Sequence, residues 1–364
     1  MKKFFLILLL LLLLSGCSAQ PEPSPTPMPT IPPTPVPTAA PTPTPLPTPE
    51  PLLIGGQSFD ISTGSVDLRG VSLSNEEKLA LREAHSDLSF GWTVDVLGVT
   101  ADSSDTYICL DGVAMEDSAP LEALLPLLPN VTKIDMCGCG LSDEEMYQLN
   151  QRHEGIRFIW VAPMGSARLR TDITYFNHNN MGMLCNLYDA RLDEHLRYFP
   201  DLIALDLGHS TVAIQRCDWL KYTPKLQYLI LADCMISDVT PIGELSDLRY
   251  LEIFTNAWLE DITPLGKLQK LEALNLSVTG IRDVTPLESC SVLRRCWLNC
   301  CWNLPYEAAE AFAANMPDCL ISLASASPTS GGWREDDIYF EMRDAFQAPY
   351  MKGDESRDNF LNKK

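Results

Sequence analysis

One spacing of apolar side chains recurs along the second half of the chain. An apolar residue or Cys stands at the first, fourth and sixth position of a short segment, and the segment starts again every 22 to 24 residues. Such self-similarity is typical of repeat architectures, in which each unit buries its apolar face against its neighbours. The sequence therefore predicts a solenoid of stacked units. The five segments begin at Leu202, Leu226, Leu248, Leu271 and Leu293.

In the last four segments, a polar or thiol side chain stands three residues after the final apolar position. The full pattern, Leu-x-x-Leu-x-Leu-x-x-Asn/Cys-x-Leu, resembles the leucine-rich repeat. Each unit then supplies one short strand and a turn, and the Asn or Cys side chain satisfies the turn from inside. We expect these thiols to be buried and reduced, with no metal or redox role. This structural turn ladder comprises Cys139, Cys234, Asn256 and Cys301.

The return side of each repeat carries a second signature. An Asp-x-Thr-Pro-Leu/Ile sequence recurs at the same phase, beginning at Asp238, Asp261 and Asp283. Thr is a good N-cap and Pro suits the first helical position, so each sequence predicts a short helix. The block 200–323 resembles the repeats of internalin-like bacterial surface proteins. That resemblance implies an α/β repeat fold: a curved parallel sheet with short convex helices, whose concave face or edge binds a protein partner.

The preceding residues, 53–199, read as the same solenoid in less regular form. Residues 73–77, Leu-Ser-Asn-Glu-Glu, reappear 68 positions later at 141–145 as Leu-Ser-Asp-Glu-Glu. In both copies Ser and Glu have capping-box spacing, which predicts the start of a helix. Strands are expected near Val66–Leu68, Tyr107–Leu110, Val131–Met136 and Phe158–Val161.

The N-terminus determines where the protein is sent. Two Lys residues precede the apolar run 4–14, and Leu-Ser-Gly-Cys follows, ending at Cys17. This order is typical of a secretory signal, and the run is shorter than the roughly 20 residues of a membrane span. The ending resembles the bacterial lipobox, which implies lipid attachment at Cys17 and cleavage just before it. We therefore expect an exported protein, facing the exterior or the cell wall and held to a bacterial membrane by its lipid alone.

Residues 18–52 are rich in Pro and Thr, and they predict an extended linker. Proline fixes φ and removes donors, so the chain favours polyproline II, and 21–51 could reach roughly 95 Å at about 3.1 Å per residue. The chain is thus divided into five segments: 1–17 signal, 18–52 linker, 53–199 irregular repeats, 200–323 regular repeats and 324–364 C-terminal cap and tail. We expect residues 333–350 to cap the exposed end of the solenoid.

Composition and motifs narrow the function. The formal net charge of −21 argues against nucleic acid as a partner. The sequence contains no His-Glu-x-x-His, Gly-x-Ser-x-Gly, phosphate-binding Gly loop or Cys-x-x-Cys. We therefore expect a protein that is not an enzyme, with no metal and no cofactor beyond the lipid on Cys17.

The repeat register also predicts the binding face. Residues that alternate with the core positions of each strand point to the concave surface. Aromatic side chains gather there on neighbouring strands, and exposed patches of this kind mark interaction sites. Folding of the C-terminal tail over the patch is the alternative. The predicted partner-binding residues are Tyr228, Ile230, Tyr250, Glu252, Phe254, Asn275 and Trp297.

Two classes of function remain. The first is a surface module that recognises a protein, or another macromolecule, through this concave face. The second is a structural or scaffolding envelope lipoprotein with no external target. The concave face should carry aromatic side chains in the first case and small polar ones in the second.

Overall fold

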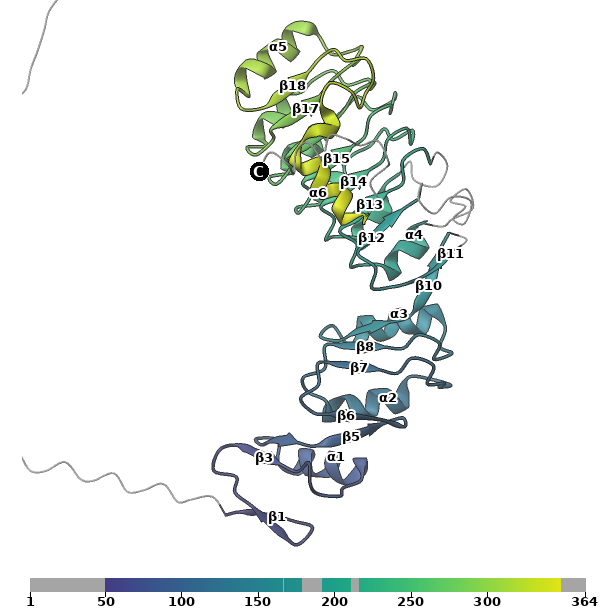
Figure 1. The fold of residues 1–364 in the computed structure, drawn as a ribbon, viewed down its shortest axis with the longest axis vertical. Coiled ribbons are helices and arrows are strands. Elements are labelled where there is room, and N and C mark those ends of the chain that lie inside the picture. The colour runs from purple at the N-terminus through teal and green to yellow at the C-terminus, as the bar shows by residue number, and fades with distance from the viewer. Residues whose placement is uncertain (1–49, 166, 179–191, 211–215, 348–364) are drawn as a thin grey trace, which may run out of the picture. The chain divides into compact units, whose positions relative to one another are not determined.

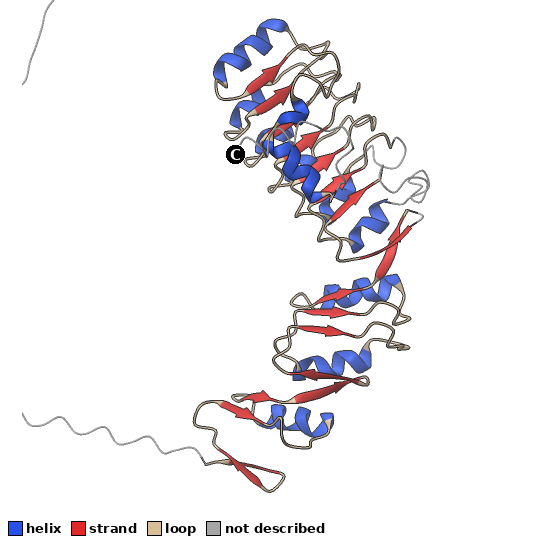
Figure 2. Cartoon of the chain, in the orientation of Figure 1, coloured by secondary structure: helices blue, strands red, loops and turns tan. Residues whose placement is uncertain are grey.

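The computed structural model describes residues 50–165, 167–178, 192–210 and 216–347 (Figure 1). Cys17 and nearly all of the Pro/Thr-rich linker lie outside the described residues. Short strands, each followed by a helix or a turn, make up the fold (Figure 2). Among the described residues, no helix has the length and hydropathy needed to cross a membrane.

The first part of the described chain has irregular units. Its helices are α1 (Asn75–Ala84), α2 (Ala119–Leu124), the 3-10 turn η1 (Leu125–Leu127) and α3 (Asp143–Arg152). Its strands are β1 (Leu52–Ile54), β2 (Gln57–Phe59), β3 (Ser65–Asp67), β4 (Ser89–Gly91), β5 (Thr93–Val96), β6 (Val99–Asp102), β7 (Tyr107–Cys109), β8 (Lys133–Asp135), β9 (Arg157–Ile159), β10 (Val161–Met164) and β11 (Ala167–Arg170).

The second part is regular. Its strands are β12 (Tyr175–Asn177), β13 (Ala204–Asp206), β14 (Tyr228–Ile230), β15 (Tyr250–Glu252), β16 (Ala273–Asn275), β17 (Arg295–Trp297) and β18 (Leu320–Ser322). Its helices are α4 (Leu192–His195), η3 (Leu196–Tyr198), η4 (Asp218–Tyr222), η5 (Ile242–Glu244), η6 (Thr263–Lys267), η7 (Thr285–Ser289), α5 (Tyr306–Asn315), η8 (Trp333–Glu335) and α6 (Asp337–Ala345).

Strands β12 to β18 form one parallel sheet in chain order. Their register pairs equivalent repeat positions, so Leu205, Leu229, Leu251, Leu274 and Cys296 lie in one row and are buried in the core. The row is continuous because every unit presents the same inward-pointing side of its strand. The protein is a leucine-rich-repeat solenoid, and its sheet extends one strand beyond 200–323 on the N-terminal side.

The short helices of the return side are 3-10 helices, and their caps differ from the prediction. The expected Thr caps are wrong: the carboxylate of the Asp two residues earlier accepts the Thr backbone N–H, at 2.8 Å for Asp238 and Asp261 and 2.9 Å for Asp283. Asp side chains favour this local bond to the backbone two residues on. Neighbouring turns approach closely, since a Cβ on Gly243 would lie 2.5 Å from the carbonyl oxygen of Pro264.

The two predicted capping boxes are completed differently. In α1, Ser74 accepts the N–H of Glu77, and Glu77 accepts the N–H of Ser74. In α3, Ser142 accepts the N–H of Glu145, but the Glu145 carboxylate accepts the N–H of Ser118 instead. The four predicted strands are present within a few residues, although Phe158–Val161 is divided between β9 and β10.

The C-terminal segment does not cap the end of the solenoid as expected. The segment η8–α6 lies on the side of the sheet opposite the core, which is the predicted concave face. In Figure 1, α6 crosses β13 to β15, and it contacts β15. A second apolar cluster forms there, separate from the core on the other side of the strands. It comprises Ala204, Tyr228, Tyr250, Ala273, Trp297, Trp333, Ile338, Tyr339, Phe340, Met342 and Phe346.

Candidate functional site

The predicted binding face is not an open surface. The side chains of Tyr250 and Trp297 are 0% exposed, and Tyr228, Glu252 and Asn275 are also buried. Ile230 and Phe254 are half-buried. The prediction of an exposed aromatic patch is therefore wrong, and the alternative is confirmed: the C-terminal tail folds over these side chains.

Trp333 is the centre of this contact. Its indole is 1% exposed and lies between two rings of the sheet, with centroids 5.4 Å from Tyr250 and 5.1 Å from Trp297. Its Nε1 donates a hydrogen bond of 2.6 Å to Oε1 of Glu252, whose carboxylate also accepts from the Tyr250 hydroxyl. Burial, reinforced by this neighbouring carboxylate, raises the pKa of Tyr250 well above its ordinary value. The Glu252 carboxylate is thus buried with two donors.

Arginines at the start of β15 and β17 pair with acids of the segment. Nη1 of Arg294 lies 2.6 Å from Asp336, and Nη1 of Arg249 lies 2.7 Å from Glu341. Arg295 lies 3.3 Å from Asp336 and also donates to the carbonyl oxygen of Gly332. Ion pairs and apolar packing therefore hold the segment against the sheet.

The turn ladder lies where the repeat register predicts it. The Asn256 side chain accepts from the N–H groups of Cys234 and Ile236, at 3.1 and 2.9 Å, and donates to the carbonyls of Leu231 and Ile253. The Cys234 and Cys301 thiols instead donate to carbonyl oxygens within 3.3 Å. Cys139 is buried in the turn after β8.

The described cysteines are free thiols, and several are deeply buried. Burial raises the pKa of Cys234 to about 12 and that of Cys290 to about 11. A thiol that stays protonated at neutral pH is a weak nucleophile and a weak metal ligand. Within the described residues, no group of three or more His, Cys, Asp or Glu side chains is placed to hold a metal ion.

A different aromatic surface is exposed, in the turns after the strands. Trp258 is 71% exposed in the turn after β15, and Trp302 is 55% exposed in the turn after β17. Met235 in the turn after β14 and Tyr306 at the start of α5 are exposed as well. We call these four residues the turn row. The prediction from sequence missed it, although the signal was there: the unit that starts at Leu248 is one residue longer than its neighbours. Leu259 takes the inward place that Ile236 and Ile281 occupy elsewhere, so the extra residue turns Trp258 outward.

Backbone contacts stack the turns that carry this row. The N–H of Thr255 donates to the carbonyl of Ser277, and the N–H of Val278 donates to that of Asn299. Gly280 lies between the two tryptophan turns, since a Cβ there would approach the carbonyl of Ala257 at 2.8 Å and Nδ2 of Asn303 at 3.6 Å. At this point the intervening turn therefore presents a glycine, which has no side chain of its own, to the backbone of the Trp258 turn.

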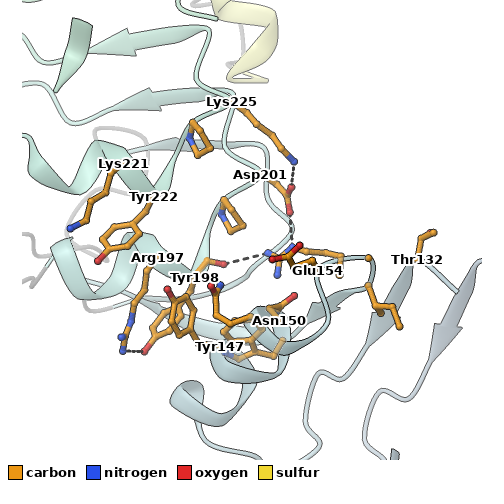
Figure 3. Close-up of a pocket in the computed structure, with 17 residues that line it drawn as sticks. Thr132, Tyr147, Asn150, Glu154, Arg197, Tyr198, Asp201, Lys221, Tyr222 and Lys225 are labelled. Carbon is orange, nitrogen blue, oxygen red and sulfur yellow. Dashed lines mark hydrogen bonds and ion pairs between the residues drawn. The ribbon is translucent and has the colours of Figure 1, made fainter. Parts of the chain in front are cut away.

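A cavity of about 550 Å³ lies between α3 and the turns η3 and η4 (Figure 3). Several of its charged groups are paired with one another or lie over aromatic rings. Asp201 lies 2.8 Å from Nε of Arg157 and 2.7 Å from Nζ of Lys225. The Arg197 guanidinium lies 4.9 Å from the ring centroids of both Tyr147 and Tyr198. These contacts join two successive units, so we interpret the cavity as the junction between these units.

Comparison with known protein families identifies the N-terminal segment. Residues 1–18 match the family model of the prokaryotic membrane lipoprotein lipid attachment site. The chain thus combines a lipoprotein attachment site with a leucine-rich-repeat solenoid.

Similar solved structures include a leucine-rich-repeat protein of Leptospira interrogans, with 18% identity over 55% of this chain and 50% of that one and a TM-score of 0.37. Internalin C2 of Listeria monocytogenes has 17% identity over 64% and 80% of the two chains, with a TM-score of 0.29. An internalin F of the same species has 16% identity over 76% and 87%, with a TM-score of 0.31. The chain spans half the length of the Leptospira protein. No curated protein is similar enough in sequence to match the chain.

Proposed function

We propose that this protein is a lipid-anchored surface module that binds a protein partner through the turn row. The observation that carries the proposal is the exposure of Trp258 and Trp302 on turns two repeats apart, along the same edge of the solenoid. Tryptophan is enriched among the residues that dominate binding energy, and exposed apolar clusters mark interaction sites. The edge replaces the concave face as the proposed contact, because the chain itself covers that face.

Polar side-chain pairs flank the aromatic centre of the row. Arg282 lies 3.0 Å from Glu260, and both side chains are largely exposed. On the other side of the row, Nδ1 of His209 lies 3.2 Å from Asp233. An apolar centre with a polar, solvated rim is the usual anatomy of a protein interface.

Site-specific cross-linking in living cells tests the proposal. A photoreactive side chain is placed at position 258 or 302 of the full chain, and at Val292 as the control. Val292 is an apolar residue of comparable exposure that is not part of the row. We expect one discrete protein adduct from 258 and 302 and none from 292. The same adducts from all three positions would exclude a specific edge and favour the scaffolding alternative.

A double variant provides the energetic test. Loss of a hot-spot aromatic side chain costs roughly 2 kcal/mol or more, which corresponds to about 30-fold weaker binding. Trp258→Ala combined with Trp302→Ala should therefore abolish capture of the cross-linked protein, whereas Val292→Ala should leave it unchanged. Unchanged capture by the double variant would place the contact elsewhere.

The anchor has a separate test. Because the lipid is expected on the thiol of Cys17, Cys17→Ser should move the protein out of the membrane fraction. Two acyl chains suffice for stable anchoring, and no apolar helix of the described residues could replace them. A variant that still sediments with membranes after salt and carbonate washes would contradict the lipid anchor.

A further inference from the structure

The side chains of the concave face have the composition of a binding site. Tyr228 and Tyr250 lie opposite each other on β14 and β15, and Trp297 lies on β17, with Arg249 and Arg295 beside them. Tyr, Trp and Arg are the residues that most often dominate interface energies. A solenoid does not need them there, because its own core lies on the other side of the strands.

The occupant of this face is an amphipathic helix. Its apolar side, which includes Tyr339, Phe340 and Phe346, faces the strands. Its acidic side chains, Asp336 and Glu341, reach the arginines of the sheet. This arrangement is the helix-in-groove mode of peptide recognition, formed here within one chain.

A linker of small residues joins the helix to the last strand. Residues 323–332 are mostly Ser, Ala and Gly, and each of them is exposed or half-buried. Gly331 and Gly332 have φ values of +71° and +86°, which favour glycine, and they set the direction in which Trp333 enters the face. The linker binds through backbone carbonyls of Pro328 and Ser330, which accept from Asn275 and Trp297 at 2.9 Å.

We infer that residues 325–347 are an intramolecular ligand of the concave face. The face is a groove for an aromatic, acidic, amphipathic helix, and the chain's own segment closes it until a helix of the same chemistry from a partner protein replaces it. Because the segment packs on an apolar cluster of its own, its departure leaves the main core of the repeats intact. A tethered competitor also raises the concentration of partner needed, since a short flexible linker gives an effective concentration of the order of millimolar.

A cleavable linker tests this inference with the whole chain present. A protease recognition sequence is inserted among the exposed residues between Ser325 and Ser330 of the full-length protein, and a fluorescent peptide of residues 325–347 is the probe. The intact chain should bind little of the peptide. After cleavage the bound segment becomes exchangeable, and we expect peptide binding at least 100-fold tighter than to the intact chain.

Two control peptides test the contacts. The Trp333→Ala peptide loses the indole between Tyr250 and Trp297, and the Glu341→Lys peptide places a cation beside Arg249. Each should bind the cleaved chain at least tenfold more weakly, and binding of the parent peptide should weaken as salt rises. A segment that never exchanges, or a cleaved chain that unfolds when it leaves, would show that 325–347 is a fixed part of the core and would overturn the inference.

The test is independent of the proposed partner at the turn row. Neither the probe nor the cleaved linker includes Trp258 or Trp302, so failure of one proposal leaves the other standing. A cross-linked partner at the turn row together with no peptide exchange would reject only the intramolecular ligand. Peptide exchange without a cross-linked partner would reject only the turn row.

Discussion

The three-stranded sheet β7–β9 and the seven-stranded sheet β12–β18 treat their outward faces in opposite ways. On β13 to β17 the outward positions include Tyr228, Tyr250 and Trp297, and the chain's own C-terminal segment covers them. On β7, Tyr107 is 47% exposed and Cys109 is exposed as well. The repeat fold therefore decides only which side chains point outward. Whether that face is covered depends on residues far away in the chain.

Electrostatics shows the same difference between the two sheets. On β8, Asp135 is buried beside Arg170, whose Nη1 lies 2.7 Å from its carboxylate. Lys133 pairs with Asp172 at 2.9 Å. The first sheet thus covers part of its face with ion pairs from β11 and the turn after it, whereas the second sheet uses an aromatic helix. Only the second arrangement concentrates apolar area on the outward side.

The largest effect should come from truncating the centre of the covered face. Trp333→Ala removes a fully buried indole and one donor to the Glu252 carboxylate, so the free energy of unfolding should fall by about 3 to 5 kcal/mol. Tyr107→Ala on the open face is the matched control and should change it by less than about 1 kcal/mol. Urea unfolding at pH 7 measures both. Equal losses of unfolding free energy would mean that the covered face and the open face contribute equally to stability.

The sequence could predict those features of the two sheets that depend on local periodicity. Leu229 and Leu251 mark the inward row because their periodicity belongs to the strand itself, and the structure pairs them directly. The docking of Trp333 could not be read in the same way, since its partner Glu252 is 81 residues distant. No spacing rule connects a tail to a surface formed by five strands. The turn row lies between these cases, because the extra residue near Trp258 is visible only when repeat lengths are compared.

The second prediction compares two steps of the turn ladder. Asn256→Ala leaves the N–H groups of Cys234 and Ile236 without their acceptor in a buried turn, which should cost about 3 kcal/mol. Cys234→Ala removes only weak thiol hydrogen bonds and a small volume, so about 1 kcal/mol is expected. Thermal and urea unfolding of both variants measure the difference. Equal costs would show that the ladder acts through packing alone.

The third prediction concerns acid stability in the first part of the chain. The hydrogen bond from Arg152 is the main cause that lowers the pKa of Glu122 from 4.5 to about 2. Burial opposes this shift, and the hydrogen bond from Ser118 adds to it. A carboxylate whose pKa is lower in the folded state stabilises the fold above its unfolded pKa, and this contribution is lost as the pH falls from about 4.5 to about 2. Glu122→Gln should therefore cost about 1 to 2 kcal/mol at pH 7 and almost nothing near pH 2. Urea unfolding at a series of pH values tests this, and a cost independent of pH would contradict it.

The smallest effect should come from the exposed tryptophan. Trp258 has the same side chain as Trp333, but it is 71% exposed and Trp333 is 1% exposed. Truncation of an exposed side chain leaves no cavity, so Trp258→Ala should change the free energy of unfolding by no more than about 0.5 kcal/mol. The extra residue of this unit still leaves Leu259 in the inward position, which keeps the core of the repeat filled. Urea unfolding of Trp258→Ala beside Trp333→Ala therefore separates a tryptophan that supports the fold from one that is free to bind. A large loss in Trp258→Ala would mean that the indole packs against its own turn, and the turn row would then no longer be the proposed contact surface.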